Sequence, residues 1–95
     1  MIIIAGSLRV DPADRDRYLA AVGPITAQAR QARGCLDFVQ AADPLEPDRI
    51  VIFERWESAE DLEWFRGSGD PGDDGAPPVV SADVRRYGIS SVGDP

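Results

Sequence analysis

The segment Arg49-Ile-Val-Ile-Phe-Glu-Arg-Trp56 (RIVIFERW) decides the fold class of this chain. It is rich in β-branched and aromatic side chains, and it is too short for a typical helix. We therefore predict a β-strand here. Alternate side chains of a strand point to opposite faces, so Ile50 and Ile52 share one face while Val51 and Phe53 share the other. Both faces of the predicted sheet thus carry apolar side chains.

Three further strands are predicted around this segment. Residues 35–42 (CLDFVQAA) precede it, separated by the turn-forming residues 43–48 (DPLEPD). The chain opens with a short apolar run, residues 1–10 (MIIIAGSLRV), which is typical of a mostly buried strand. Residues 84–92 (VRRYGISSV) predict the last strand.

Two helices are predicted between these strands. Asp11-Pro12 is typical of a helix start, because Asp caps a helix and Pro suits its first position. An apolar stripe at helical spacing follows, formed by Tyr18, Val22, Ile25, Ala29 and Ala32. We expect Pro24 to kink or divide this helix and Gly34 to end it. The capping-box sequence 58–61 (SAED) predicts a second, shorter helix.

The predicted order β-α-β-β-α-β is the plan of the ferredoxin-like α+β fold. We expect one domain over residues 1–95, with a four-stranded antiparallel sheet and both helices on one face. The other face then needs cover, and a second copy packed sheet to sheet would supply it, so we expect a homodimer. Residues 67–78 (GSGDPGDDGAPP) are too polar and too rich in Gly and Pro to join the core, and they predict a flexible loop.

Composition excludes several classes of function. The 95 residues carry a net charge of −7, so neither nucleic acid nor an anionic membrane is an expected partner. The chain lacks His and Lys, which removes Ser-His-Asp triads, Schiff bases and the usual Cys/His zinc sites. We expect no metal and no cofactor. The single cysteine, Cys35, fits a reducing compartment, and no apolar run is long enough to cross a membrane, so we expect a cytoplasmic protein without a signal peptide.

Four segments of the chain, in this order and spacing, are similar to segments of a known protein family. They are the opening strand before Asp11-Pro12, residues 33–38 (RGCLDF), residues 48–58 (DRIVIFERWES) and the final strand from Val84 to Tyr87. In these segments the chain resembles the antibiotic biosynthesis monooxygenase family, whose members are dimeric α+β barrels. The resemblance covers nearly the whole chain outside residues 67–78. It implies oxidation of a phenolic, quinol or aromatic polyketide-like small molecule by O₂, without metal or flavin.

The chain departs from this family at polar positions. Many members carry His in the second helix, where this chain has residues 62–66 (LEWFR), and another His soon afterwards. Some members use an Asn, which is also absent here. The wider superfamily also contains haem-degrading oxygenases, which bind the haem iron through His. The absence of His argues against membership of that branch. Two alternatives to a monooxygenase therefore stay open, namely a non-catalytic small-molecule-binding or accessory dimer and a polyketide cyclase or lyase.

The substrate-binding candidates are side chains that can wall an aromatic pocket or stabilise a phenolate. They are Trp64, Tyr18, Tyr87, Arg66 and Phe38. A packing or surface role competes with ligand binding at each of them, and the sequence assigns no catalytic residue. Trp64 and its neighbour Phe65 cannot face the same side of a helix, so one of them is expected to lie outside the core. Residues 67–78 either close over the pocket as a lid or form a passive connection.

Overall fold

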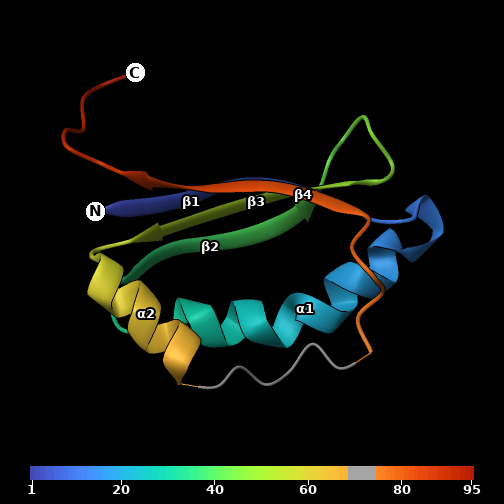
Figure 1. The fold of residues 1–95 in the computed structure, drawn as a ribbon, viewed down its shortest axis with the longest axis horizontal. Coiled ribbons are helices and arrows are strands. Elements are labelled where there is room, and N and C mark those ends of the chain that lie inside the picture. Colours follow the sequence, from blue (N-terminus) through green and yellow to red (C-terminus); the bar gives the residue numbers. More distant parts are fainter. Residues whose placement is uncertain (69–74) are drawn as a thin grey trace.

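The four predicted strands pair into one antiparallel sheet with two helices on one of its faces (Figure 1). The computed structural model describes residues 1–68 and 75–95. Its elements are β1 (Ile2–Arg9), the 3₁₀ turn η1 (Pro12–Asp14), α1 (Arg15–Arg30), β2 (Cys35–Ala42), β3 (Arg49–Trp56), α2 (Ala59–Gly67) and β4 (Ser81–Gly88). The strand order β2-β3-β1-β4 confirms the predicted α+β, ferredoxin-like plan.

The last strand differs from its prediction. Residues 84–92 were expected, whereas β4 runs from Ser81 to Gly88. Pairing with β1 sets these bounds, since Ser81 lies opposite Arg9 and Gly88 lies opposite Ile2. The first residues of β4 are small, polar and exposed, so the local sequence carried no strand signal there. The prediction was wrong at both ends because backbone pairing overrides local propensity at an edge strand.

The first helix differs from its prediction at both ends and at Pro24. Asp11 caps the 3₁₀ turn η1, because its side chain accepts a hydrogen bond of 2.9 Å from the Ala13 backbone N–H, and α1 follows from Arg15. The helix ends at Arg30, so Gly34 does not end it as predicted. Pro24, however, lies inside the single helix α1, so the predicted division is wrong. Gly23, Pro24 and the preceding Ala20 are all exposed. The backbone carbonyl deprived of its partner by the proline therefore faces water, and the helix continues past it.

Gly34 allows the two helices to approach each other closely. It adopts φ +79°, and a side chain at this position would overlap Asp61 at the start of α2. The predicted capping box is formed in part, with Ser58 as the N-cap of α2. The Asp61 backbone N–H donates to Ser58 Oγ at 3.1 Å, and the Ser58 hydroxyl donates back to Asp61 Oδ2 at 3.0 Å. The turn after α1 thus packs directly against the first turn of α2.

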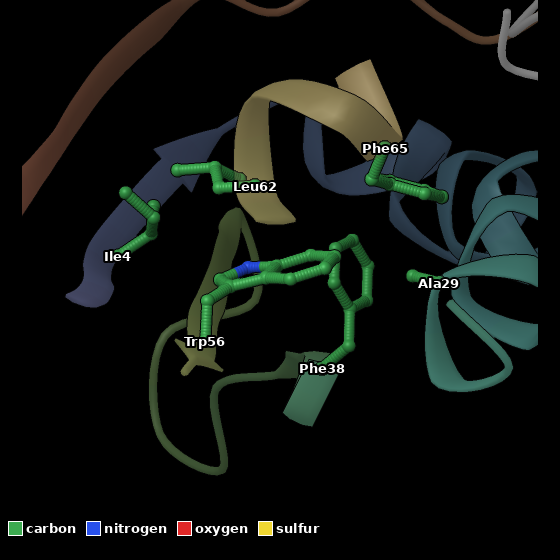
Figure 2. Packing of buried hydrophobic residues seen from close by; sticks show 6 residues of the cluster. All are labelled: Ile4, Ala29, Phe38, Trp56, Leu62 and Phe65. Atoms are coloured by element: carbon green, nitrogen blue, oxygen red, sulfur yellow. The ribbon is translucent and has the colours of Figure 1, made fainter. Parts of the chain in front are cut away.

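The core lies between the sheet and the helices, in two clusters of buried side chains. One cluster, shown in Figure 2, contains Ile4, Ala29, Phe38, Trp56, Leu62 and Phe65. The other contains Leu8, Val10, Tyr18, Val22, Ile50 and Ile52. The predicted alternation of β3 is therefore confirmed, with Ile50 and Ile52 on the helix-facing side.

The opposite side of the sheet, which we call the open face, carries apolar side chains that no described helix covers. Val51, Phe53 and Val39 lie on it, and Phe53 is 36 % exposed. Arg55 and Asp37 form an ion pair of 2.8 Å across neighbouring strands of the same face. Figure 1 shows α1 and α2 together on the other side of the sheet.

A carboxylate in the turn between β2 and β3 makes the stability of the fold depend on pH in the acid range. The Asp43 carboxylate accepts hydrogen bonds from the backbone N–H groups of Glu46 (2.8 Å) and Leu45 (2.9 Å) and from the Arg49 guanidinium (2.7 Å). These contacts lower the pKa of Asp43 from 3.8 to about 2. Because the folded pKa is depressed, this stabilisation is present above about pH 4 and is lost as the pH falls towards about 2.

We expect Asp43→Asn to be less stable than the wild type at neutral pH, and the two proteins to converge as the pH falls through this range. Thermal unfolding followed by circular dichroism at a series of pH values measures the difference. A gap in melting temperature that stays constant down to about pH 2 would contradict the assignment.

Candidate functional site

The structure does not bring the five predicted substrate-binding residues into one place. Trp64 and Arg66 lie on α2, Phe38 lies on β2, Tyr18 lies on α1 and Tyr87 lies on β4. They divide among the outer surface of the helices, the helix-facing core and the open face. Selection by residue type therefore named aromatic and cationic groups that do not all lie in one place in one copy of the chain.

Trp64 lies on the outer surface of α2, where it is 63 % exposed, while Phe65 is buried. The expectation that only one of the two enters the core is thus confirmed. The Arg33 guanidinium lies 5.3 Å from the centre of the Trp64 ring. Trp64 borders a shallow hollow of about 340 Å³ that is also lined by Gln28, Gln31, Ala32, Arg33, Phe65 and Ser68.

The two tyrosines lie on opposite faces of the sheet. Tyr18 is buried in the second core cluster, beside Val22 and Ile50, which supports its packing role. Tyr87 lies opposite Ile3 of β1 on the open face and is 49 % exposed. Their hydroxyl groups therefore do not share a pocket within one copy of the chain.

Phe38 belongs to an aromatic wall on the helix-facing side, together with Trp56 and Phe65. The Phe38 and Phe65 rings meet edge to face, with centroids 6.1 Å apart, and the Trp56 and Phe65 centroids are 5.4 Å apart. Figure 2 shows the Trp56 ring beside Phe38, with Leu62 and Phe65 coming down from α2. Trp56 is completely buried.

Glu54 is the functional candidate that the sequence reasoning missed. It lies on the helix-facing side of β3, with Ile4 opposite it on β1 and Phe38 opposite it on β2. Its side chain is partly buried, and its Oε1 accepts a hydrogen bond of 3.0 Å from Trp56 Nε1. The alternation along β3 places Glu54 on the same face as Ile50 and Ile52, so a charged residue at that position was the available signal.

Burial raises the pKa of Glu54, while the hydrogen bond from Trp56 and the positive charge of Arg66 oppose this rise in part. Arg66, one of the predicted site residues, therefore acts on the helix-facing side through its charge. Burial also raises the pKa of the Cys35 thiol, and the negative charges of Glu54 and Asp37 add to the rise. Cys35 is accordingly a protonated thiol at neutral pH.

Gln40 adds a second polar group on the helix-facing side. It lies opposite Ile52, and its buried side-chain oxygen has no hydrogen-bond partner in the structure. Within residues 1–68 and 75–95, no three His, Cys, Asp or Glu side chains gather closely enough to hold a metal ion. In the same part of the chain, no helix has the length and apolar character needed to span a membrane. Residues 69–74 of the predicted loop or lid lie outside the described residues.

Comparisons with known proteins agree on one family. The family model described as antibiotic biosynthesis monooxygenase matches residues 1–71. A candidate monooxygenase of this type from Chloroflexus aurantiacus has 26 % identity and a TM-score of 0.72, with 97 % of this chain and 96 % of that chain covered. No match was found among curated proteins.

Two further solved structures show the same fold at lower identity. A candidate antibiotic biosynthesis monooxygenase from Deinococcus radiodurans has a TM-score of 0.81 at 20 % identity, covering 99 % of this chain and 97 % of that one. One from Nitrosomonas europaea has a TM-score of 0.81 at 14 % identity, covering 96 % of this chain and 100 % of that one.

Proposed function

Because this chain belongs to the antibiotic biosynthesis monooxygenase family, we propose that it oxidises a small phenolic or quinol molecule with O₂ on the helix-facing side of its sheet. One observation carries the choice of site. The aromatic wall of Phe38, Trp56 and Phe65 adjoins a partly buried carboxylate, Glu54. Aromatic side chains hold a flat ring, and a carboxylate binds its hydroxyl group.

The proposed reaction places few demands on the protein. A phenol and O₂ give a para-quinone and water, so one oxygen atom enters the ring and the other leaves as water. The ionised substrate supplies the electrons. The protein has to hold the ring, favour its anion and exclude water. The completely buried Trp56 and the buried Phe38 and Phe65 provide apolar surroundings of this kind.

Oxygen consumption tests the proposal. Purified protein treated with a chelator is mixed with a panel of phenols and quinols, and O₂ uptake is followed with an electrode while quinone formation is followed by absorbance. At least one compound is expected to give equal rates of O₂ loss and quinone gain above the protein-free blank. Blank rates across a panel that varies ring number and substitution would reject the monooxygenase proposal.

A non-catalytic small-molecule-binding or accessory role is the second candidate. The position of Trp64 favours it, because this exposed ring borders a hollow on the outer surface, away from Glu54. Ligand binding that is lost in Trp64→Ala but kept in Glu54→Gln would support this role. Conversion of a substrate in the absence of O₂ would instead identify a polyketide cyclase or lyase.

We further propose that the chain forms a homodimer through the open face. This face exposes Phe53 and Val39 beside the ion pair of Arg55 and Asp37, which gives an apolar centre with a charged border. An apolar centre within a polar rim is typical of protein interfaces. A second copy of the same face would remove these side chains from water.

Phe53→Arg is expected to convert the dimer to a monomer, because it would bury unpaired charges at the centre of the interface. Light scattering at micromolar concentration should give about twice 10.3 kDa for the wild type and 10.3 kDa for the variant. Ala27→Arg is the control, since Ala27 is exposed on α1, which lies on the other side of the sheet (Figure 1). A monomeric wild type would contradict the proposed interface.

A further inference from the structure

We propose that Glu54 is the general base of this site, and that it removes the proton from the phenolic hydroxyl of the substrate. The inference rests on the proposed function and deepens it by naming the group that forms the reactive anion. It also defines the substrate class more closely. The ligand must present an un-ionised aromatic hydroxyl, because a carboxylate attracts a hydrogen-bond donor and repels a phenolate.

The placement of Glu54 is unusual for a carboxylate. On the helix-facing side of β3 it lies between Ile52 and Trp56, both of them buried in the core. Its cross-strand neighbours, Ile4 and Phe38, are also buried and apolar. A charged group within such a layer costs stability unless it is paired and fully hydrogen-bonded, and within the described part of the chain Glu54 has a single hydrogen bond, from Trp56. Apolar side chains at the four neighbouring positions would pack well around an apolar residue here, so packing alone does not explain the carboxylate.

The carboxylate is held by one oxygen and leaves the other available. Trp56 Nε1 donates to Glu54 Oε1 at 3.0 Å, and Trp56 is itself fixed by complete burial beside Phe65. Among the described residues, no other hydrogen bond to this carboxylate is found. Oε2 is therefore oriented and can accept a proton from a ligand, as a general base requires.

Charged groups on the surrounding elements affect the balance between the protonated and the ionised form of Glu54. From α2, Arg66 favours the carboxylate. From β4, Arg86 faces the same side but is paired with Glu63 of α2 at 2.8 Å. From α1, Arg30 donates to the Phe38 carbonyl at 2.9 Å.

The remaining neighbours of Glu54 add little positive charge. From β2, Cys35 is a protonated thiol, and the facing residues of β1 are apolar. Burial outweighs the favourable contacts and raises the pKa of Glu54 above its ordinary 4.5. A higher pKa makes Glu54 a stronger base towards a phenol.

In the first step the O–H bond of the phenol breaks, its proton moves to Glu54 Oε2, and its electron pair stays on the substrate oxygen. The resulting phenolate is the electron donor to O₂, which is the oxidant of the proposed reaction. One oxygen atom bonds to the ring carbon para to the hydroxyl, that carbon loses its hydrogen, and the O–O bond breaks. The other oxygen atom leaves as water with this hydrogen and the proton from Glu54, so the carboxylate is regenerated for the next turnover.

The test uses the full chain, Glu54→Gln and a matched control, Glu57→Gln. Glutamine keeps an oxygen for the Trp56 hydrogen bond but cannot act as a base, whereas Glu57 is exposed at the end of β3. Glu54→Gln is expected to slow O₂ consumption by about 100-fold or more, which is the usual contribution of a general base. Glu57→Gln is expected to keep the wild-type rate. Circular dichroism verifies that both variants fold.

A binding measurement decides the role of Glu54 independently of turnover. The probe is 4-nitrophenol, whose affinity for the wild type is measured by absorbance titration as a function of pH. The affinity should fall on the order of tenfold as the pH drops through the raised pKa of Glu54, because the protonated acid no longer accepts the hydroxyl proton. We call this loss of affinity at low pH the acid limb. In Glu54→Gln the acid limb should disappear.

The outcomes separate the two proposals. If no phenol or quinol supports O₂ uptake but the acid limb depends on Glu54, the monooxygenase proposal fails and the assignment of Glu54 as the hydroxyl acceptor stands. If the wild type consumes O₂ and Glu54→Gln keeps its rate, Glu54 is not the base. An acid limb that is absent from the wild type, or unchanged in the variant, also overturns the assignment.

Discussion

Gly6→Ala is expected to destabilise the chain by about 2–5 kcal/mol and to loosen β4 from the sheet. Gly6 adopts φ +152° in β1. A side chain on Gly6 would overlap the Asp83 backbone carbonyl and the Val84 Cα of β4. These are backbone atoms held by the strand pairing, so they cannot rotate aside as a flexible side chain would. Since β1 joins β3 to β4, displacing β4 removes one edge of the sheet.

Urea denaturation followed by circular dichroism measures this loss, and Gly88→Ala provides the control. Gly88 also lies in the β1–β4 pair, opposite Ile2, but a side chain there would meet no atom nearby. The control should stay within about 0.5 kcal/mol of the wild type. Equal stability of Gly6→Ala and the wild type would show that β4 does not approach β1 as described.

Trp56→Ala is the second change with a large expected effect, a loss of about 3–5 kcal/mol. The substitution would leave a cavity beneath α2, where the indole packs beside Phe65, and it would leave Glu54 partly buried without its hydrogen-bond donor. A domain of this size has a total stability of about 5–15 kcal/mol, so the substitution is expected to remove a substantial fraction of it.

The second tryptophan is a matched control for this prediction. Trp64→Ala removes the same side chain from an exposed position, and its cost should stay below about 1 kcal/mol. Chemical denaturation of both variants gives the comparison. A loss in Trp56→Ala no greater than that in Trp64→Ala would contradict the burial of Trp56.

The fold was predictable where local sequence and tertiary pairing agree. The segments 35–42 and 49–56 match β2 and β3 residue for residue, because β-branched and aromatic side chains favour strands and turn-forming residues separate them. Residues 81–83 (SAD) have no such preference, and they are strand only because β1 lies beside them. The division of the helix at Pro24 was wrongly predicted for a related reason. The cost of a proline depends on whether the freed carbonyl faces water, which is a tertiary property.

The site was less predictable because it depends on how elements are rotated against each other. Trp64 and Phe65 are adjacent aromatic residues, and only the contact of α2 with the sheet decides that Phe65 enters the core. Tyr87 falls on the open face through its pairing with Ile3. Glu54 was missed because candidates were chosen among aromatic and cationic residues. Alternation along β3 already placed this carboxylate on the apolar side.

The proposed function requires that one oxygen atom from O₂ enters a phenolic ring on the helix-facing side of the sheet. Mass spectrometry of the product formed under isotopically labelled O₂ tests this requirement, with wild type and Glu54→Gln run side by side. We expect a quinone carrying one labelled oxygen atom from the wild type and little product from the variant. An unlabelled product, or equal labelled product from both proteins, would contradict it.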